Sequence, residues 1–400
     1  MPFTLSLAIT NGDEIFAPGG AVEGFATFDL RETIKAKQIR VIAEGCANTK
    51  WLLSEGSKAS HGRSREVSYT AKTTYMDEEL VVWKPSEGHA KSSIFPGCHV
   101  FPFKFVIPEN APPSFKGDHG IIRYSIKAIV ERPWKTNRST TKYFTVCPKK
   151  DLNNIATARD EASSSKLKKV GFFLFFRHGK VGSQMTIPKK GYVAGETISV
   201  ETKIANDSSR PIIKAECYLV ERCKYLAYRY GIGDPNSTHY KEDLPDDSYS
   251  SRKHDEHRLA TISQDLEIPA RSQHSLNLQL PIPCVCPSFA STLITVEYVV
   301  IVKLVVKCRL VNTVKTECPI ILGTIPLKDE AIDPGTPHFG EAPSVVQLTH
   351  RSMTSCDDEK ALPKYIFYPR YNKPKIDDEP PILIDTLPPI DTLSMEDECQ

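Results

Sequence analysis

The chain has 400 residues, of which 40% are apolar and 25% charged, a composition typical of a soluble protein with two or three domains. Its first residues, MPFTLSLAIT, lack the basic segment and cleavage site of a secretory signal, and no apolar run reaches the roughly 20 residues of a membrane helix. The eleven scattered cysteines include no Cys-x-x-Cys pair, so we expect reduced thiols in a cytosolic or membrane-peripheral protein.

Charge is distributed unevenly along the chain. Residues 324–400 hold 7 Lys/Arg and 15 Asp/Glu, whereas residues 1–323 hold 44 and 34. A mildly basic body suits an anionic surface or an acidic peptide, although an ordinary solvated surface gives the same counts. Aromatic and basic residues do not interleave as they do in RNA-binding proteins, so we expect no nucleic acid partner.

Short segments of alternating apolar and polar residues recur through the first half of the chain. The clearest are FTLSLAI, QIRVIAEG, VFPFKFVI and RYSIKAIV, at residues 3–9, 38–45, 100–107 and 123–130. A period of two residues is typical of a β-strand with one buried face. No convincing amphipathic helix of 12 or more residues appears, so the pattern predicts antiparallel β-sandwiches.

A polar, serine-containing stretch at residues 148–169 separates this region from a second one that is also rich in strand signals. The following segment, KVGFFLFFRHGK at residues 169–180, predicts either the first strand of a second domain, buried on both sides, or a segment that inserts into a membrane surface. Further on, residues 229–258 form a long polar insertion, which is either a mobile loop or an elongated hairpin.

The second region repeats the first. IPENAPPSF and GIIRYSIKAIVE, at residues 107–115 and 120–131, correspond to IPCVCPSF and LITVEYVVIVKLVV, at residues 282–289 and 293–306. Phe115 with Phe289, and Tyr124 with Tyr298, are both 174 residues apart. Because distant segments keep the same spacing, a whole domain is repeated, and we predict that each copy encloses its own hydrophobic core.

The predicted fold class is therefore all-β, with two tandem immunoglobulin-like antiparallel β-sandwiches at residues 1–147 and 169–323 and a linker at residues 148–168. After Gly323 the composition changes, because 11 of the 30 prolines lie in residues 324–400 and strand-length apolar runs disappear. Such a segment cannot bury enough apolar surface to offset its chain entropy. We predict a disordered tail at residues 324–400.

Motifs for catalysis or for cofactor and metal binding are not recognisable, since the chain lacks G-x-S-x-G, a Walker loop, a Rossmann glycine fingerprint and H-E-x-x-H. His254 and His257 flank two acidic residues, but they lie in the polar insertion, where solvated charge is the favoured interpretation over a metal site. Cys284 and Cys286 form one Cys-x-Cys pair, which favours packing at a strand entry over a soft-metal site. We expect neither an enzyme nor a bound metal or cofactor.

The segment PPSFKGDHGIIRYSIKAIVERPW, at residues 112–134, resembles the amino-terminal domain of arrestins, and of the alpha-arrestins (arrestin domain-containing proteins) in particular. Six residues that match the family pattern are expected to have structural roles: Pro113, Phe115, Gly117, Gly120, Tyr124 and Lys127. The match also includes Ser114, Ala128, Arg132 and Pro133. The second repeat, with KKGYVAGETISV at residues 189–200, resembles the carboxy-terminal arrestin domain. The resemblance covers about residues 1–322 and implies an arrestin N-domain and C-domain.

The resemblance implies a non-catalytic adaptor that links membrane cargo to ubiquitin ligases of the HECT type and to endocytic machinery. Its expected cargo is the cytoplasmic tails of membrane proteins, captured by strand addition at an exposed sheet edge. Its expected location is the cytoplasm, with recruitment to the plasma membrane and endosomes. Family members recruit ligases through PPxY motifs, whose tyrosine fills a groove on a WW domain.

No PPxY motif occurs in this chain. LPKY and YPRY keep the Pro-x-Tyr core, and their candidate WW-binding residues are Leu362, Pro363, Tyr365, Pro369 and Tyr371. Alternatively, these tyrosines belong to an ordinary tail or to a last strand that packs on the body.

The tail also contains EPPILI, which fits the acidic dileucine pattern read by clathrin adaptors. Its candidate adaptor-binding residues are Glu379, Leu383 and Ile384. The alternative to a trafficking adaptor is a regulatory scaffold, which binds a soluble signalling or redox partner without recruiting a ubiquitin ligase. The resemblance suggests it, because one family member behaves in this way. Cys217 and Cys223 are candidate thiols for such a partner, and the alternative is that both are core residues.

Overall fold

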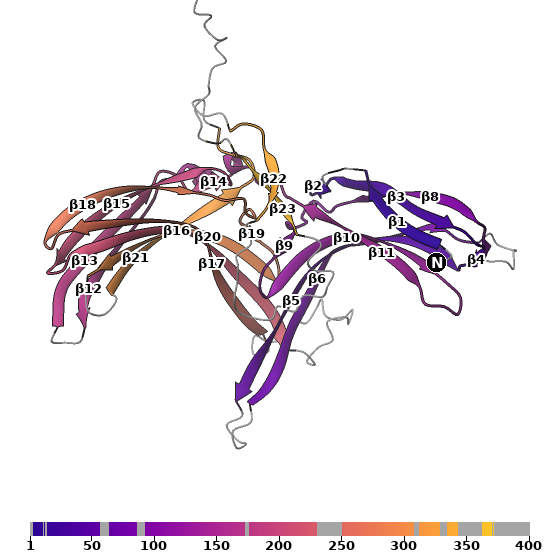
Figure 1. Ribbon diagram of the computed structural model, residues 1–400, viewed down its shortest axis with the longest axis horizontal. Helices are drawn as coiled ribbons and strands as arrows, with labels where there is room; N and C mark the ends of the chain where they lie inside the picture. Colours follow the sequence, from indigo (N-terminus) through magenta and orange to yellow (C-terminus); the bar gives the residue numbers. More distant parts are fainter. Residues whose placement is uncertain are drawn as a thin grey trace, which may run out of the picture.

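Figure 1 shows a computed structural model of the chain, in which two β-sandwiches lie next to each other along the longest axis. The structure describes residues 3–10, 12, 14–56, 64–85, 93–172, 176–229, 250–307, 312–328, 334–342, 362–369 and 371. Two short 3-10 helices, Leu152–Asn154 and Ala156–Arg159, are the only helices among these residues. Neither has the length or the apolar character that crossing a bilayer requires.

The amino-terminal sandwich packs a three-stranded sheet against part of a larger sheet. The three strands, in spatial order, are β1 (Phe3–Ile9), β3 (Ala21–Leu30) and β8 (Gly97–Val106). The strands of the larger sheet, in spatial order, are β6 (Ser64–Trp83), β5 (Gln38–Gly56), β10 (Gly120–Glu131), β11 (Arg138–Val146) and β2 (Ile15–Phe16). Alternate residues of β3 and β10 are buried, as a period of two residues predicts.

The carboxy-terminal sandwich has the same two-layer design. One layer consists of β12 (Ala162–Phe172), β13 (Phe176–Ile187), β15 (Thr197–Ser208) and β18 (Ser272–Pro281). The other consists of β17 (Ser250–Ile268), β16 (Ile212–Arg229), β20 (Ile294–Val306), β21 (Asn312–Gly323) and β14 (Gly191–Val193). Four short strands complete the two domains: β4 (Ile34–Lys35), β7 (Ser93–Ile94), β9 (Phe115–Lys116) and β19 (Phe289–Ala290). The predicted class of two tandem antiparallel β-sandwiches is confirmed.

Equivalent hydrogen bonds recur in the two sandwiches. The hydroxyl of the buried Tyr124 donates to the Pro112 carbonyl at 2.8 Å, and the hydroxyl of Tyr298 donates to the Cys286 carbonyl at 2.6 Å. The short strands β2 and β14 pair in parallel with β11 and β21, respectively. Repetition of side-chain bonds and strand pairs at matching positions confirms that the chain contains a duplicated domain.

The two sandwiches share a hydrophobic junction, so the expectation of two separate cores is wrong. Phe115 and Phe289, which occupy equivalent positions in the repeat, pack edge to face with their ring centroids 5.6 Å apart. Strand β16 pairs with β6 of the first domain near Tyr228, and the Thr49 hydroxyl donates to the Leu226 carbonyl at 2.6 Å. The cores merge because equivalent apolar ends of the two copies meet, and contact between them buries the Phe115 ring and part of the Phe289 ring.

The second sandwich begins earlier than predicted, because β12 starts at Ala162, inside the predicted linker at residues 148–168. The serines at the start of β12 do not show the alternation of apolar and polar residues that predicts a strand, so the sequence did not predict this part of β12. Strand β12 lies at the edge of its sheet and pairs only with β13 among the described strands, and such an edge accepts polar residues.

Residues 169–180 are not a single strand, since they include the end of β12 and the start of β13. Residues 173–175 between these strands lie outside the described residues.

The polar insertion at residues 229–258 belongs to an elongated hairpin, one of the two predicted alternatives. Strand β16 ends at Arg229 and pairs with β17 from Ser250 onward, and residues 230–249 between them lie outside the described part of the chain.

The segment after Gly323 is not structureless throughout, which corrects the predicted tail. Strand β22 (His338–Glu341) pairs with β23 (Lys364–Phe367), and the hairpin lies over the junction of the two sandwiches in Figure 1. Three tyrosines, Tyr365, Tyr368 and Tyr371, are only 3% to 7% exposed. Burying three aromatic rings offsets the entropy of ordering a short segment. We call β22, β23, Tyr368, Pro369 and Tyr371 the C-terminal strap.

Candidate peptide-binding groove at the edge of the first sandwich

A polar groove of about 730 Å³ runs along the outermost long strand of the first sandwich. Its floor and one wall are formed by β11 from Ser139 to Thr145 and by β10 from Ile121 to Arg123. Residues 362–364 and Glu341, from the C-terminal strap and the residues before it, form the opposite wall. The groove is therefore built from segments that are nearly 200 residues or more apart in the sequence.

The groove exposes the edge of a β-sheet. Strand β11 pairs with β10 from Arg138 to Phe144, and only its last two residues also pair with β2. Among the described strands, none pairs with the other edge of β11 between Arg138 and Phe144. The outward N–H and C=O groups of such an edge are a template for an added strand. Strand addition is therefore an interaction that this edge of β11 can support.

Basic side chains outnumber acidic ones around the groove. Lys116, Arg123, Lys142 and Lys364 line it, together with the acidic Glu14 and Glu341. The Lys142 ammonium lies 2.7 Å from a Glu14 carboxylate oxygen, so this pair is neutralised locally. The guanidinium of Arg123 lies over the ring of Tyr143, 4.8 Å from its centroid. The remaining lining charge is positive, which favours an acidic segment as the occupant.

The C-terminal strap is anchored to both sandwiches. The hydroxyl of the buried Tyr365 lies 3.3 Å from the Ser114 carbonyl oxygen of the first domain, to which it donates. Its own carbonyl accepts a weak hydrogen bond from the Cys284 thiol of the second domain at 3.6 Å. The Tyr368 N–H donates to the Ala194 carbonyl at 3.0 Å, which adds a second bond to that domain. Burial raises the pKa of Tyr365 well above its ordinary value, so the phenol stays protonated and able to donate.

The candidate WW-binding residues are divided between surface and interior. Leu362 is 42% exposed and Pro369 is exposed, but Tyr365 and Tyr371 are buried. A WW domain must enclose the tyrosine of its ligand, and it cannot reach Tyr365 while the strap is in place. The alternative of a last strand packed on the body is confirmed for Tyr365. The other adaptor-binding candidates, Glu379, Leu383 and Ile384, lie outside the described residues.

The six structural residues of the motif lie in and around β10. Pro113, Phe115 and Tyr124 are buried, and Lys127 is half-buried. The two motif glycines face the second domain. A Cβ atom on Gly117 would lie 2.1 Å from the Tyr225 hydroxyl, and one on Gly120 would lie 2.9 Å from the Ile294 side chain. The glycines therefore permit the two sandwiches to approach each other, a role that the sequence pattern alone did not reveal.

The thiols proposed for a redox partner are inaccessible. Cys217 is completely buried and Cys223 is 1% exposed, and both lie on β16. Burial raises the pKa of Cys217 to about 12 and raises the pKa of Cys223 as well. Only a thiolate exchanges with a disulfide, so neither thiol suits a surface redox contact, and the alternative of core residues is confirmed.

The residues that line the groove were not predicted from the sequence. The segment RSTTKYFTV at residues 138–146 contains β-branched and aromatic residues, a signal that could have revealed β11. The opposite wall could not be found in this way, because Glu341 and residues 362–364 reach the groove only when the strap packs on the body.

Comparison with known proteins places this architecture in a family. Residues 5–153 match the model of the arrestin (or S-antigen) N-terminal domain, and residues 177–327 match the model of the arrestin C-terminal domain. Arrestin domain-containing protein 17 of Caenorhabditis elegans is 26% identical over 327 residues, which cover 80% of this chain and 70% of that protein.

Two human relatives match shorter regions. Arrestin domain-containing protein 4 is 30% identical over 212 residues, 52% of this chain and 50% of the relative. Thioredoxin-interacting protein is 26% identical over 230 residues, 56% of this chain and 55% of the relative. The matched regions thus span about half the length of these human proteins. With both domain models matched in order and the duplicated sandwich fold in place, the chain belongs to the arrestin family and is related to the arrestin domain-containing proteins, or alpha-arrestins.

Proposed function

We propose that the chain is a non-catalytic adaptor that captures extended, acidic cytoplasmic segments of membrane proteins at the edge of β11. The captured segment adds a strand to the first sandwich, and the residues after the second sandwich bring in ubiquitin-ligase and endocytic machinery. This activity requires a cytoplasmic protein that is recruited to the plasma membrane and endosomes with its cargo.

A sheet edge that opens into a positively charged groove is the observation that carries this proposal. Main-chain hydrogen bonds of an added strand supply affinity for many sequences, and the surrounding charge selects among them. The family of the chain supports an adaptor, and the wide range of cargo that an adaptor meets suits backbone recognition.

Charge reversal in the groove is expected to weaken the binding of an acidic peptide. A fluorescein-labelled peptide of alternating glutamate and valine is a suitable probe, because it favours an extended strand. The Lys116→Glu/Lys364→Glu variant replaces attraction by repulsion on both sides of the groove, and we expect about a tenfold or greater loss of affinity, equivalent to about 1.4 kcal/mol. Fluorescence anisotropy at low and high salt measures the effect, which salt should reduce.

The matched control is Lys166→Glu/Lys169→Glu, which makes the same change of net charge on exposed residues of β12 in the other sandwich. It is expected to retain most of the wild-type affinity for the peptide. If the two double variants lose affinity equally, the attraction comes from the overall charge of the protein and the groove is not the binding site.

Ligase recruitment through LPKY requires that the C-terminal strap first leave the junction of the two sandwiches. Tyr365 of LPKY is buried, and Tyr368 stabilises the strap through its ring and through a hydroxyl that donates to the Thr324 carbonyl at 2.9 Å. The Tyr368→Ala variant should loosen the strap and leave LPKY intact. We expect this variant to bind an isolated WW domain several-fold more tightly than the wild type in a pull-down titration.

Tyr365→Ala/Tyr368→Ala is the control, because it loosens the strap equally and removes the tyrosine that the WW domain requires. This double variant should lose the gain in WW binding that LPKY supplies, whereas Pro369 and Tyr371 are present in both variants and contribute equally to each. Equal binding by the single and double variants would contradict recruitment through LPKY and leave cargo capture at β11 unaffected.

A further inference from the structure

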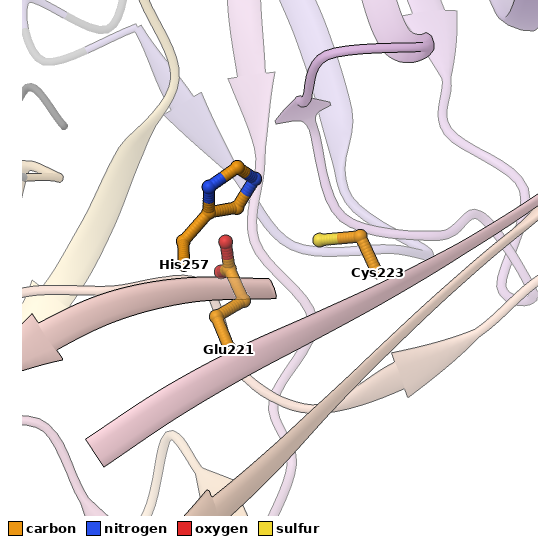
Figure 2. A group of neighbouring side chains, drawn as sticks. All are labelled: Glu221, Cys223 and His257. Carbon is orange, nitrogen blue, oxygen red and sulfur yellow. The ribbon is translucent and has the colours of Figure 1, made fainter. Parts of the chain in front are cut away.

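Four side chains gather on one face of the β16–β17 hairpin, at the junction of the two sandwiches. Glu221 and Cys223 are two residues apart on β16, and their partners directly across the strand pair are His257 and Asp255 on β17. Residues two apart on a strand face the same side, so the four side chains lie on one face of the hairpin, where Asp255 belongs to a second group of potential ligands with Asp118 and His257. The ligand atoms of Glu221, Cys223 and His257 all lie within 4.8 Å of one another, and Figure 2 shows their functional groups converging.

The first domain closes over this cluster. The carboxylate of Asp118, in the loop between β9 and β10, lies 3.8 Å from His257 Nε2. The neighbouring His119 lies with its Nε2 atom 3.5 Å from Asp255 Oδ1. Cys223 and His257 are 1% and 8% exposed, whereas Asp118 is exposed at the rim. The cluster is thus shielded from bulk water but can be reached past Asp118.

Several features of the cluster suit a bound cation. The buried Oδ2 atom of Asp255 has no hydrogen-bond partner among the described residues, an arrangement that costs free energy unless something binds it. The Tyr298 hydroxyl lies 2.9 Å from one carboxylate oxygen of Glu221 and 2.6 Å from the Cys286 carbonyl, so its single proton is shared between the two acceptors and Glu221 has a fixed polar neighbour. In known metal sites, hydrogen-bonding groups that do not touch the metal hold the metal ligands in the right orientation.

The donor set selects among metals. Sulfur, imidazole nitrogen and carboxylate oxygen are the ligands of zinc, whereas magnesium and calcium take oxygen ligands. Bonds of about 2.0 to 2.3 Å place the ligand atoms of a tetrahedral zinc ion roughly 3.3 to 3.8 Å apart. The ligand atoms of Glu221, Cys223 and His257 lie within 4.8 Å of one another, so small side-chain rotations are enough to reach this range. The solvated-charge interpretation of His257 is wrong, because the structure buries this residue.

We propose that Glu221, Cys223 and His257 bind a zinc ion on the β16–β17 hairpin of the second domain, beside the Asp118–His119 loop of the first. The ion replaces the protons of the Cys223 thiol and of any protonated carboxyl, as zinc does in structural sites. Both strands that carry the ligands are anchored in a sheet, so the site is held on rigid elements. The role is structural, and it is independent of cargo capture at β11.

The test uses the full chain, freed of metal with a chelator and then titrated with Zn²⁺ or Co²⁺. We expect one tightly bound zinc ion per chain by elemental analysis, and a rise in the thermal midpoint, because the ion binds the folded state. Co²⁺ should give a thiolate-to-metal charge-transfer band and the visible bands of a tetrahedral site. The Cys223→Ser and His257→Gln variants should lose stoichiometric zinc, and Cys223→Ser should lose the charge-transfer band.

Cys217→Ser is the matched control, because Cys217 is a buried cysteine of the same strand that lies outside the cluster. It should retain the zinc ion and the cobalt spectrum. Circular dichroism of the metal-free proteins separates misfolding from loss of a ligand, and Cys223→Ala serves as a second variant if Cys223→Ser does not fold. The proposal is overturned if the folded wild type retains no zinc, or if folded Cys223 variants retain zinc and the charge-transfer band.

Discussion

Replacing Tyr365 with alanine is expected to release the C-terminal strap while both sandwiches stay folded. The side chain is 3% exposed, and its hydroxyl donates to the Ser114 carbonyl. Truncating a buried aromatic ring typically costs about 3 to 5 kcal/mol of stability. We expect the two remaining anchors, Tyr368 and Tyr371, to be too few to keep the strap docked after this loss. Hydrogen exchange followed by mass spectrometry should show rapid exchange in β22 and β23 and unchanged exchange in β10 and β20.

Leu362→Ala provides the control, since Leu362 precedes the same strand but is 42% exposed. It should leave the exchange of β22 and β23 close to that of the wild type. Slow exchange of both strands in Tyr365→Ala would mean that Tyr365 does not anchor the strap. It would also remove the reason to expect that LPKY is concealed in the native protein.

Alanine at Gly117 is expected to destabilise the contact between the two sandwiches. Its Cβ atom would lie 2.1 Å from the Tyr225 hydroxyl and 2.8 Å from the Phe115 ring, and both rings are buried. Overpacking of this kind typically costs up to about 3 kcal/mol. For domains of this size, we expect the thermal midpoint to fall by about 2 to 4 °C per kcal/mol. Differential scanning calorimetry measures the shift.

A second substitution separates a steric clash from other effects of Gly117→Ala. Tyr225→Phe removes the hydroxyl that the new methyl group would meet, so Gly117→Ala should cost less in the Tyr225→Phe background than in the wild type. A coupling of roughly 1 kcal/mol or more is typical of residues in direct contact. If the two substitutions are additive, Gly117 does not determine how closely the two domains approach at Tyr225.

The fold could be predicted because its signals are local and occur twice. Tyr124 and Tyr298 lie in alternating apolar segments, and each sits beside the same proline-rich turn sequence, so the duplication predicts two similar sandwiches. The merged core could not be predicted. Phe115 and Phe289 each look like an ordinary core residue, and only the packing of one domain on the other brings the two rings together.

The strap and the metal-binding cluster illustrate what the sequence conceals. Tyr365, Tyr368 and Tyr371 lie in a region whose average composition is acidic and rich in proline, which hid three closely spaced aromatic anchors. His257 lies on a strand with a polar exposed face, and its pairing with Glu221 depends on the register of β17 against β16. That register is fixed across 20 intervening residues, so no local periodicity indicates it.

The most direct measurement of cargo capture is hydrogen exchange of the full chain with and without the glutamate–valine peptide. Strand addition predicts slower exchange at amides of β11 between Arg138 and Phe144, because new main-chain hydrogen bonds form there. A lysine–valine peptide should produce no such protection. The contrary result is that anisotropy shows binding of the acidic peptide while the exchange of β11 is unchanged. In that case the edge of the first sandwich is not the capture site.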